Sequence, residues 1–467
     1  MAFIRNISWL ENVLWLQWFA AATALLMSTT VGLMFGWTSP YLLRLTAEDS
    51  ELPITSNEGS WVASLLNLGR FLGAFVGGFC VEYLGSKQTL TALGVPLIMA
   101  WICIMVADSV IWLYVARILG GISVGMSFSS FPLYLGEVSS PTIRGTVVTL
   151  AMSGFSFGTT IGNAMGVYLS MKVFAYVSIV PSILFVLIFL WIPQSPHYLV
   201  RIGKLEQAEK SIARYNPGAN SKLEVQHLKE FVVARDGLSF MDRMREMNIP
   251  RNRQAMIISI MLFFFMQFSG MNSLVYYMEI TLTDAGITFI APATLVIILG
   301  VLGIAAGWVS IFIADKFRRK ALMIVSSAGV GVSMAAYGTH FALLDGGFDP
   351  EPLQWLPVTA GVIFLLFICI GLIPVPNMIL SEIFAPNIKS VAACFASISI
   401  GLFAFAASRS YQPLVDVIGE SWVFWLHSFL MVLSIIFAAI WMPETKGKTL
   451  QEIQNNIRKI KDYDDKY

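Results

Sequence analysis

The feature that most constrains the fold is a series of twelve apolar runs, each long enough to cross a bilayer. A helix needs about 20 predominantly apolar residues to span the hydrocarbon core. The runs lie near 17–39, 59–82, 89–108, 110–135, 146–170, 173–192, 254–283, 290–314, 321–344, 355–381, 390–414 and 421–442. Because lipid offers no partner to free backbone groups, each run is expected to be a helix. The sequence therefore predicts an all-α membrane protein.

Composition excludes several other classes of protein. Hydrophobic residues make up 56% of the chain and charged residues only 13%, whereas soluble proteins carry about a quarter charged residues. Lys and Arg number 30 against 29 Asp and Glu, so no basic face for nucleic acid is expected. The four cysteines all lie in apolar runs and are interpreted as small hydrophobes, with no disulfide or metal cluster.

Between 193 and 253 the apolar pattern gives way to a segment with eleven Lys and Arg residues. Apolar residues recur there at helical spacing, which predicts short amphipathic helices in water. We therefore expect an N-terminal six-helix bundle over 1–192 and a cytoplasmic helical linker over 193–253. A C-terminal six-helix bundle is expected over 254–445, followed by a cytoplasmic tail over 446–467.

The distribution of basic residues predicts the orientation in the membrane. Short loops on the cytoplasmic side of membrane proteins carry an excess of Lys and Arg. With the linker inside, Lys87, Arg144, the basic cluster 316–320, Lys389 and the Lys-rich tail also lie inside. Both termini are then cytoplasmic, and we expect a multi-pass protein of the plasma membrane.

The two halves of the chain repeat three charged signals in the same order. They follow the second and eighth spans, the fourth and tenth spans, and the sixth and twelfth spans. Parallel six-span repeats are a transporter architecture. Acids and bases at these helix ends could pair to close the cytoplasmic side in one state, or they could simply reflect topology. The candidate gating residues are Glu82, Lys87, Glu137, Arg144, Asp315, Arg319, Glu382, Lys389 and Glu444.

These motifs resemble the sugar porter family of the major facilitator superfamily over nearly the whole chain. The Glu…Arg-Gly and Pro-Glu-Thr-Lys-Gly motifs are intact at 137–145 and 443–447. Gln-Gln-x-Ser-Gly-x-Asn-x-x-x-Tyr-Tyr is present over 266–277 with Met266 at its first position. Gly-Arg-Arg and Pro-Glu-Ser-Pro-Arg become Gly-Ser-Lys and Pro-Gln-Ser-Pro-His. The end of the first span, 37–40, looks like that of the insect facilitated trehalose transporters.

The resemblance implies a major facilitator fold and facilitated sugar transport by alternating access. It places sugar contacts on the seventh span at Gln267 and Asn272, whose carboxamides offer donors and acceptors to hydroxyls. It places Tyr276 and Tyr277 beyond them, where they could cover the sugar or belong to the interfacial aromatic belt. The fifth candidate substrate residue is Asn377, which stands where the family has a tryptophan in the tenth span.

Several departures from the family concern the sugar itself. Met152, Met266 and Gly303 stand where the family has Gln, Gln and Asn. Most polar groups that hold a hexose are therefore missing, which leaves trehalose, another polyol or a changed substrate open. The Ser269-Gly270 pair could unwind the seventh span and turn both Gln267 and Asn272 inward.

Arg70 lies near the middle of the second span. A charge at the centre of a membrane is costly, and it indicates a functional site by default. Arg70 could bind an anionic substrate or pair with an acid such as Glu279, Asp284 or Asp416. The alternative is a structural role in which it donates to carbonyl groups of a neighbouring helix.

The first span, 17–39, contains no Asp or Glu. The family's proton symporters carry an acid there, so its absence favours uniport. We expect no enzymatic activity, no cofactor and no metal site, and the four histidines are expected to be structural. The expected protein is a monomer that binds a small-molecule sugar and lipid, with no nucleic acid. A transporter-like sugar sensor, a carrier of a non-sugar substrate and a proton symporter remain as alternatives.

Overall fold

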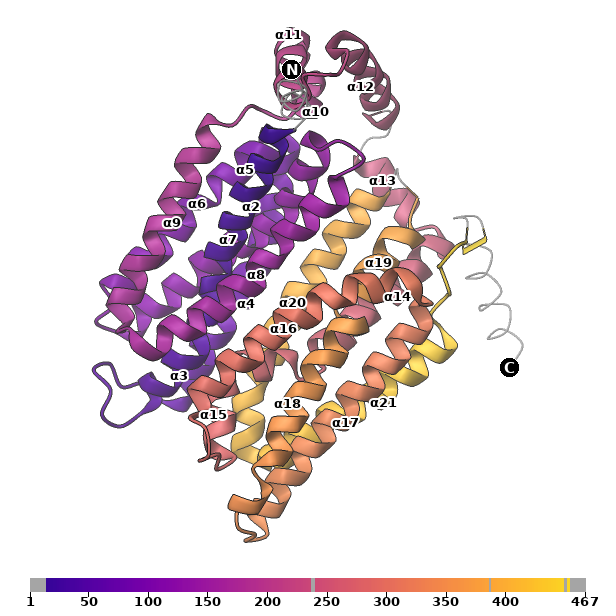
Figure 1. Ribbon diagram of the computed structural model, residues 1–467. Helices are drawn as coiled ribbons and strands as arrows, with labels where there is room; N and C mark the ends of the chain where they lie inside the picture. The colour runs from indigo at the N-terminus through magenta and orange to yellow at the C-terminus, as the bar shows by residue number, and fades with distance from the viewer. Residues whose placement is uncertain (1–13, 237–239, 386–387, 449–451, 454–467) are drawn as a thin grey trace, which may run out of the picture.

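The computed structural model describes residues 14–236, 240–385, 388–448 and 452–453. Most of the predicted tail over 446–467 lies outside these ranges, and the side chain of Asp315 is likewise outside the described part. The described residues are almost entirely helical, and they contain no strand. Two sets of long helices stand side by side, and four short helices lie above one end of them (Figure 1).

The first set of long helices contains eight segments. They are α2 (Trp15–Gly36), α3 (Thr38–Thr46), α4 (Ser56–Leu84), α5 (Ser86–Ala92), α6 (Gly94–Met105), α7 (Val110–Val138), α8 (Arg144–Tyr168) and α9 (Met171–Trp191). The short helices that follow are α10 (Pro196–Arg201), α11 (Leu205–Tyr215), α12 (Ser221–Asp236) and α13 (Phe240–Met247). We call the end of the bundles near α10–α12 the linker end, and the opposite end the far end.

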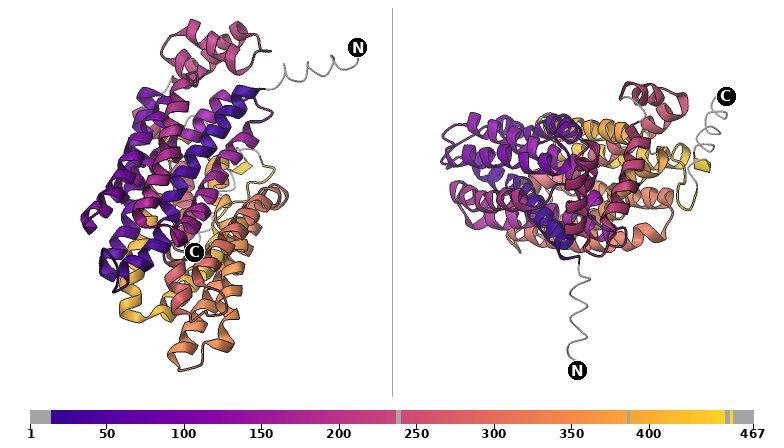
Figure 2. Two further views of the ribbon diagram at one scale, coloured as in Figure 1. Left: turned by 60° about the vertical axis from the view of Figure 1, so that its left-hand side comes forward. Right: turned by 90° about the horizontal axis from the view of Figure 1, so that it is seen from above.

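The second set of long helices also contains eight segments. They are α14 (Pro250–Gln267), α15 (Met271–Asp284), α16 (Pro292–Lys316), α17 (Arg319–Asp345), α18 (Trp355–Phe367), α19 (Pro374–Ile383), α20 (Lys389–Ile418) and α21 (Glu420–Ile440). A π-helical segment, Ile368–Leu372, joins α18 to α19. Figure 2 shows from above that the two sets form neighbouring bundles.

Eleven helices in the described ranges are long and apolar enough to cross a membrane. The predicted fifth span corresponds to α8, which has 25 residues but is not among the eleven. Its sequence is rich in Gly, Ser and Thr, which lowers its hydropathy although its length suits a bilayer. The chain is thus a multi-pass membrane protein, and the predicted count of twelve spans is not confirmed.

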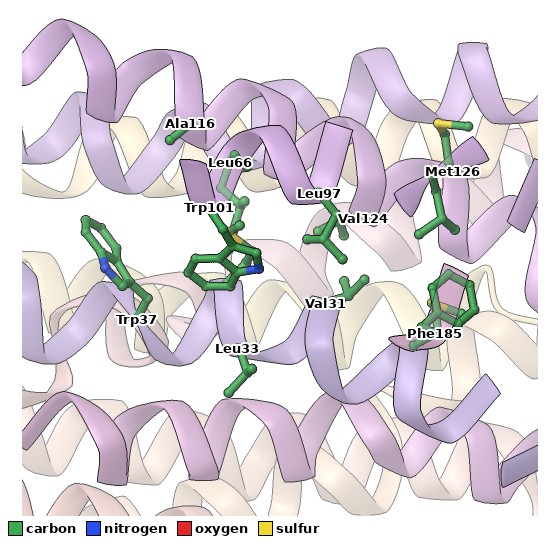
Figure 3. Packing of buried hydrophobic residues seen from close by; sticks show 14 of the residues in the cluster. Val31, Leu33, Trp37, Leu66, Leu97, Trp101, Ala116, Val124, Met126 and Phe185 are labelled. Atoms are coloured by element: carbon green, nitrogen blue, oxygen red, sulfur yellow. The ribbon is translucent and has the colours of Figure 1, made fainter. Parts of the chain in front are cut away.

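Each bundle is organised around its own buried apolar cluster. The cluster of the first bundle includes Trp37, Trp101, Leu97 and Phe185, and its packing is shown in Figure 3. A second cluster runs from α13 through α21 and contains Phe364 among its core residues. The first cluster also takes in a few side chains of the second bundle, such as Tyr276, so apolar packing continues across the junction between the bundles.

Glycines bring several helices into backbone contact. A Cβ atom added to Gly32 of α2 would lie 2.5 Å from the carbonyl oxygen of Phe155 in α8. A Cβ at Gly69 of α4 would lie 2.3 Å from the carbonyl oxygen of Ile118 in α7. Small residues permit such close packing where lipid supplies no hydrophobic drive. The same device joins the two bundles, because a Cβ at Gly401 of α20 would lie 2.8 Å from the Cα of Phe71 in α4.

The linker helices are fixed to the first bundle by a buried polar contact. The Gln17 amide donates to the carbonyl oxygen of Tyr215 at 3.0 Å, and its own oxygen accepts the backbone N–H of Ser140 at 2.8 Å. The Tyr215 hydroxyl lies 2.8 Å from that of Tyr134 and donates to the Pro193 carbonyl at 2.9 Å. Burial raises the pKa of the Tyr215 phenol above its usual value, so it is a neutral donor.

Candidate substrate site and gates

The predicted seventh span is broken in its middle. Helix α14 ends at Gln267 and α15 begins at Met271. Gly270 between them has φ +88°, a left-handed conformation that favours glycine. A Cβ at this position would also lie 2.6 Å from the sulfur of Met334. The interruption suggested by the Ser269-Gly270 pair is therefore present.

The break brings the two predicted carboxamides into direct contact. Asn272 Nδ2 donates to Gln267 Oε1 at 2.9 Å and to the Gln267 backbone oxygen at 3.1 Å. Both side chains are buried, and Gln267 Nε2 has no hydrogen-bond partner. An unmade bond of a buried donor costs about 1–3 kcal/mol. The pair thus presents one free donor that a ligand oxygen could satisfy.

His427 of α21 supports the broken segment. Its Nδ1 lies 2.9 Å from the carbonyl oxygen of Phe268, and its Nε2 lies 3.3 Å from the Ser273 hydroxyl. These contacts provide a partner for a carbonyl left free where α14 ends. The prediction of a structural histidine agrees with this placement, but its link to the seventh span was not foreseen. His427 and Phe268 lie about 160 positions apart in sequence, and no motif in the sequence connects them.

Tyr276 and Tyr277 are both buried, and they contact different partners. The Tyr276 hydroxyl donates to Asn67 Oδ1 of α4 at 3.2 Å, and its ring stacks on Phe35 with centroids 6.4 Å apart. The Tyr277 ring lies 4.7 Å from that of Tyr411 in α20. Both tyrosines therefore lie inside the protein, and neither forms part of an exposed interfacial belt.

Asn377, the fifth predicted substrate residue, is not joined to this group by any hydrogen bond found among the described residues. Its side chain is exposed, and its Nδ2 donates to the Ile373 carbonyl at 2.9 Å within the same turn. The structure therefore unites Gln267 with Asn272 and leaves Asn377 apart.

Polar contacts between the bundles form a junction from mid-membrane to the far end. Asn67 Nδ2 donates to the Ser408 hydroxyl at 3.2 Å and to the Ala404 carbonyl at 3.3 Å. Arg409 donates to Asn57 at 2.8 Å and to Ser60 at 3.1 Å. Arg409 thus links α20 to α4. The roles of Asn67 and Ser408 were missed, because neither belongs to a motif that marks contacts across helices.

The candidate gating residue Glu137 of the first bundle is bonded to hydroxyl groups. Glu137 accepts hydrogen bonds from Ser86 and from Ser195, both at 2.6 Å. Arg144 donates instead to the Ser139 carbonyl at 3.3 Å. No ion pair joins Glu137 to Arg144 in the described part of the chain. Arg144 is the first residue of α8 and contacts the end of α7 only at its backbone.

The equivalent candidate gating residues of the second bundle form an ion pair. Arg319 pairs with Glu382 at 3.0 Å, and the Thr445 hydroxyl donates to the same carboxylate. Glu444 accepts the backbone N–H groups of Arg319 at 3.1 Å and Lys320 at 3.3 Å. Acceptors at the first turn of α17 satisfy donors that a helix leaves free. These contacts all stay within one bundle.

The other candidate gating residues have weaker contacts. Glu82 lies 3.8 Å from Arg201 of α10 in an exposed pair. Lys87 donates to the Leu190 carbonyl at 3.4 Å. Lys389 is exposed, and within the described ranges no ion pair links it to Glu382. Contacts this exposed are worth at most about 1 kcal/mol.

One apolar groove on the first bundle lies away from all these residues. It occupies about 520 Å³ between α2, α8 and α9. Its lining, almost wholly apolar, is Thr29, Leu33, Ile161, Met165, Tyr176, Val177, Val180 and Pro181. Tyr176, Val177 and Val180 are exposed on α9, so this groove opens to the lipid side and offers little to a sugar.

Comparison with known proteins gives consistent results. A family model described as "Sugar (and other) transporter" matches residues 20–457. A "Facilitated trehalose transporter Tret1-2 homolog" of Drosophila sechellia is 30% identical over 449 residues, 96% of this chain and 92% of the relative. The "Facilitated trehalose transporter Tret1" of Drosophila virilis is 30% identical over 446 residues. The chain spans about half the length of that relative, 49%.

Solved structures support the fold. The inward open conformation of the xylose transporter XylE from E. coli superimposes with a TM-score of 0.79 at 22% identity, covering 94% of this chain and 99% of that one. A partially occluded inward open conformation of the same transporter gives a TM-score of 0.73 at 23% identity. The chain therefore shares its two-bundle fold with that protein.

Proposed function

This chain belongs to the sugar transporter family, and from that premise we propose that it is a facilitative carrier that moves a sugar across the membrane by alternating access. The observation that carries the proposal is the carboxamide pair at the break between α14 and α15. Gln267 and Asn272 are buried, bonded to each other and left with one unsatisfied donor. A sugar hydroxyl is an acceptor that would complete this set.

The proposed substrate is trehalose or a hexose. The relatives named as trehalose transporters motivate the first of these. The positions held by Met152, Met266 and Gly303 supply no polar side chain, so affinity is expected to depend heavily on the carboxamide pair. Each hydroxyl lacking a partner in a buried site weakens binding by about 1–3 kcal/mol.

Downhill transport is supported by the first span. Helix α2 carries no Asp or Glu that could bind a coupled proton. The polar contacts between the bundles, at Asn67 and Arg409, support a state closed at the far end. Contacts of this kind must break for the other state to form, which is the requirement of alternating access.

We further propose a plasma-membrane location with both termini cytoplasmic. The excess of Lys and Arg near α10–α13 and at the linker end of α17 supports this orientation. The proposed units are the bundles over 1–192 and 254–445, the linker over 193–253 and the tail over 446–467. The proposed carrier acts as a monomer in lipid, without enzymatic activity, cofactor or nucleic acid.

The test is uptake of labelled trehalose and glucose by cells that express the chain, with equal pH on both sides. Saturable uptake that Gln267→Ala abolishes supports the proposal. The matched control is Gln226→Ala, which removes the same carboxamide from an exposed position on α12. No uptake by a chain present at the cell surface contradicts it.

One alternative function has a specific observation in its favour. A sugar sensor that no longer transports would also lack these sugar contacts. So would a carrier of another substrate. Ligand binding to the purified protein without any uptake favours the sensor. Uptake that rises with an inward proton gradient instead favours a proton symporter.

A further inference from the structure

Arg70 lies midway along α4, a helix of 29 residues that spans the membrane. Its backbone is fixed by the glycines of α7. A Cβ at Gly125 would lie 2.3 Å from the Arg70 carbonyl oxygen, and one at Gly121 would lie 2.9 Å from its nitrogen. These contacts leave little room for α4 to shift against α7, so they define the depth of the Arg70 backbone in the membrane.

The guanidinium of Arg70 lies against aromatic rings. Its Cζ is 4.7 Å from the centroid of Phe128, which stacks on Phe155 at 4.6 Å. One turn away on α4, Asn67 receives the Tyr276 hydroxyl from the second bundle. Arg70 therefore lies near the junction of the bundles, close to the α15 part of the broken seventh span.

Arg70 has no counter-ion in the described part of the chain. None of the ion pairs found there involves it, and Glu279, Asp284 and Asp416 are not within pairing distance. No hydrogen-bond acceptor for its five N–H groups is found among the described residues either, and only the aromatic contact partners the side chain.

Arg117 of α7 shows what a structural arginine looks like in this protein. It is fully buried and donates to the carbonyls of Met34 at 2.7 Å and Val62 at 3.1 Å. It also donates to the Thr38 hydroxyl at 2.5 Å. Arg117 thus has the structural role in which an arginine donates to carbonyl groups of neighbouring helices. Arg70 does not have this role.

A positive charge at mid-membrane with free donors requires an explanation, because such residues are costly and mark substrate paths. A guanidinium presents a planar fork that matches a carboxylate with two parallel hydrogen bonds. A single cation balances a single negative charge, whereas a phosphate ester brings nearly two at neutral pH. The lone Arg70 therefore fits a monocarboxylate better than a phosphate.

We infer that Arg70 binds the carboxylate of an anionic substrate, so that the preferred cargo is a sugar acid rather than a neutral sugar. This inference rests on the proposed function, because it uses the same site and the same carrier cycle. The hydroxyls of the cargo would meet Gln267 and Asn272, and its carboxylate would meet Arg70. The ion pair of the carboxylate with Arg70 would then offset the hydrogen bonds that Met152 and Met266 cannot make.

The experiment compares D-glucuronate with D-glucose, which differ by a carboxylate in place of a hydroxymethyl group. Binding to the purified full-length chain and uptake by proteoliposomes are measured for the native protein, Arg70→Gln and Arg70→Lys. The control, Arg253→Gln, removes an exposed arginine near the start of α14. We expect glucuronate to bind the native protein at least about tenfold more tightly than glucose.

The variants separate a specific contact from a structural effect. Arg70→Gln should lose this preference while it retains glucose binding, and Arg70→Lys should recover only part of it because an ammonium lacks the fork. Uptake of glucose without any binding of glucuronate overturns the inference and leaves the proposed function in place. Equal loss of both ligands in Arg70→Gln also overturns it. Binding of neither ligand by the native chain contradicts both proposals.

Discussion

The Ser86 hydroxyl donates to the Glu137 carboxylate at 2.6 Å in the first bundle, at the place where Arg319 pairs with Glu382 in the second. The two equivalent candidate gating sites therefore differ in chemistry. One holds its carboxylate with neutral hydroxyls and the other with a cation. Charged residues of the family pattern are replaced in the motifs at 85–87 and 193–197. These motifs contain Ser86 and Ser195, the two hydroxyl partners of Glu137.

This asymmetry predicts unequal effects of neutralising the two carboxylates. Glu137→Gln keeps an oxygen that can accept from both serines, so the free energy of unfolding should fall by less than about 1 kcal/mol. Glu382→Gln leaves Arg319 without its carboxylate and should cost about 1–3 kcal/mol. Thermal unfolding of the two purified variants measures the difference. A larger loss for Glu137→Gln would show that its environment is more ionic than the described contacts indicate.

The break between α14 and α15 predicts that Gly270→Ala is strongly destabilising. The substitution forces a left-handed conformation, which costs about 1–2 kcal/mol, and drives a Cβ into Met334. Gly203→Ala is the matched control, because Gly203 has φ +77° and open space around it. Sugar binding and thermal unfolding should be impaired more by Gly270→Ala than by Gly203→Ala. Equal effects would mean that the Met334 contact is easily relieved.

The contact of His427 with the Phe268 carbonyl predicts a loss of sugar binding from a distant helix. His427→Ala leaves that carbonyl without its side-chain partner and should cost about 1–3 kcal/mol. Binding should weaken because the carboxamides of Gln267 and Asn272 are positioned by the break. His427→Asn retains a donor of similar reach and should recover most of the affinity. Unchanged affinity in His427→Ala would show that the break holds its shape unaided.

The junction at Asn67 predicts a shift between the two transport states. Asn67→Ala removes three hydrogen bonds between the bundles. At about 0.6 kcal/mol each in a membrane protein, their loss should change the equilibrium by roughly tenfold or more. A cysteine at Ser60, in a chain whose native cysteines are replaced, should then react faster with an impermeant maleimide added at the far end. Tyr276→Phe removes one of the three bonds and should give a smaller increase.

The sequence predicted the helical fold and the break well, because both depend on local chemistry. Long apolar runs and the Ser269-Gly270 pair are sufficient to indicate them. The number of spans was harder to predict from the sequence. Helix α8 packs against α2 through glycines, so it exposes less surface to lipid and needs fewer apolar residues than a lipid-facing helix. The composition of a segment does not show whether other helices or lipid surround it.

The partners of charged residues could not be predicted, because they come from helices far apart in sequence. Arg70 and Arg117 both lie in apolar runs, yet only Arg117 finds carbonyls of α2 and α4. The repetition of Glu137 and Arg144 as Glu382 and Lys389 suggested that such acids and bases could pair. The described contacts instead involve Ser86 and Arg319, which motif spacing alone does not identify.

The close approach of Gly401 to Phe71 has a mechanical consequence for inhibition. Two bundles that touch backbone to backbone near their middle can rotate relative to each other about that point of contact. Separation on one side then presses the bundles together on the other. A compound wedged between the bundles at the linker end would therefore tighten the contacts around Arg409 without touching them. Such a compound could arrest transport while the sugar site itself stays empty.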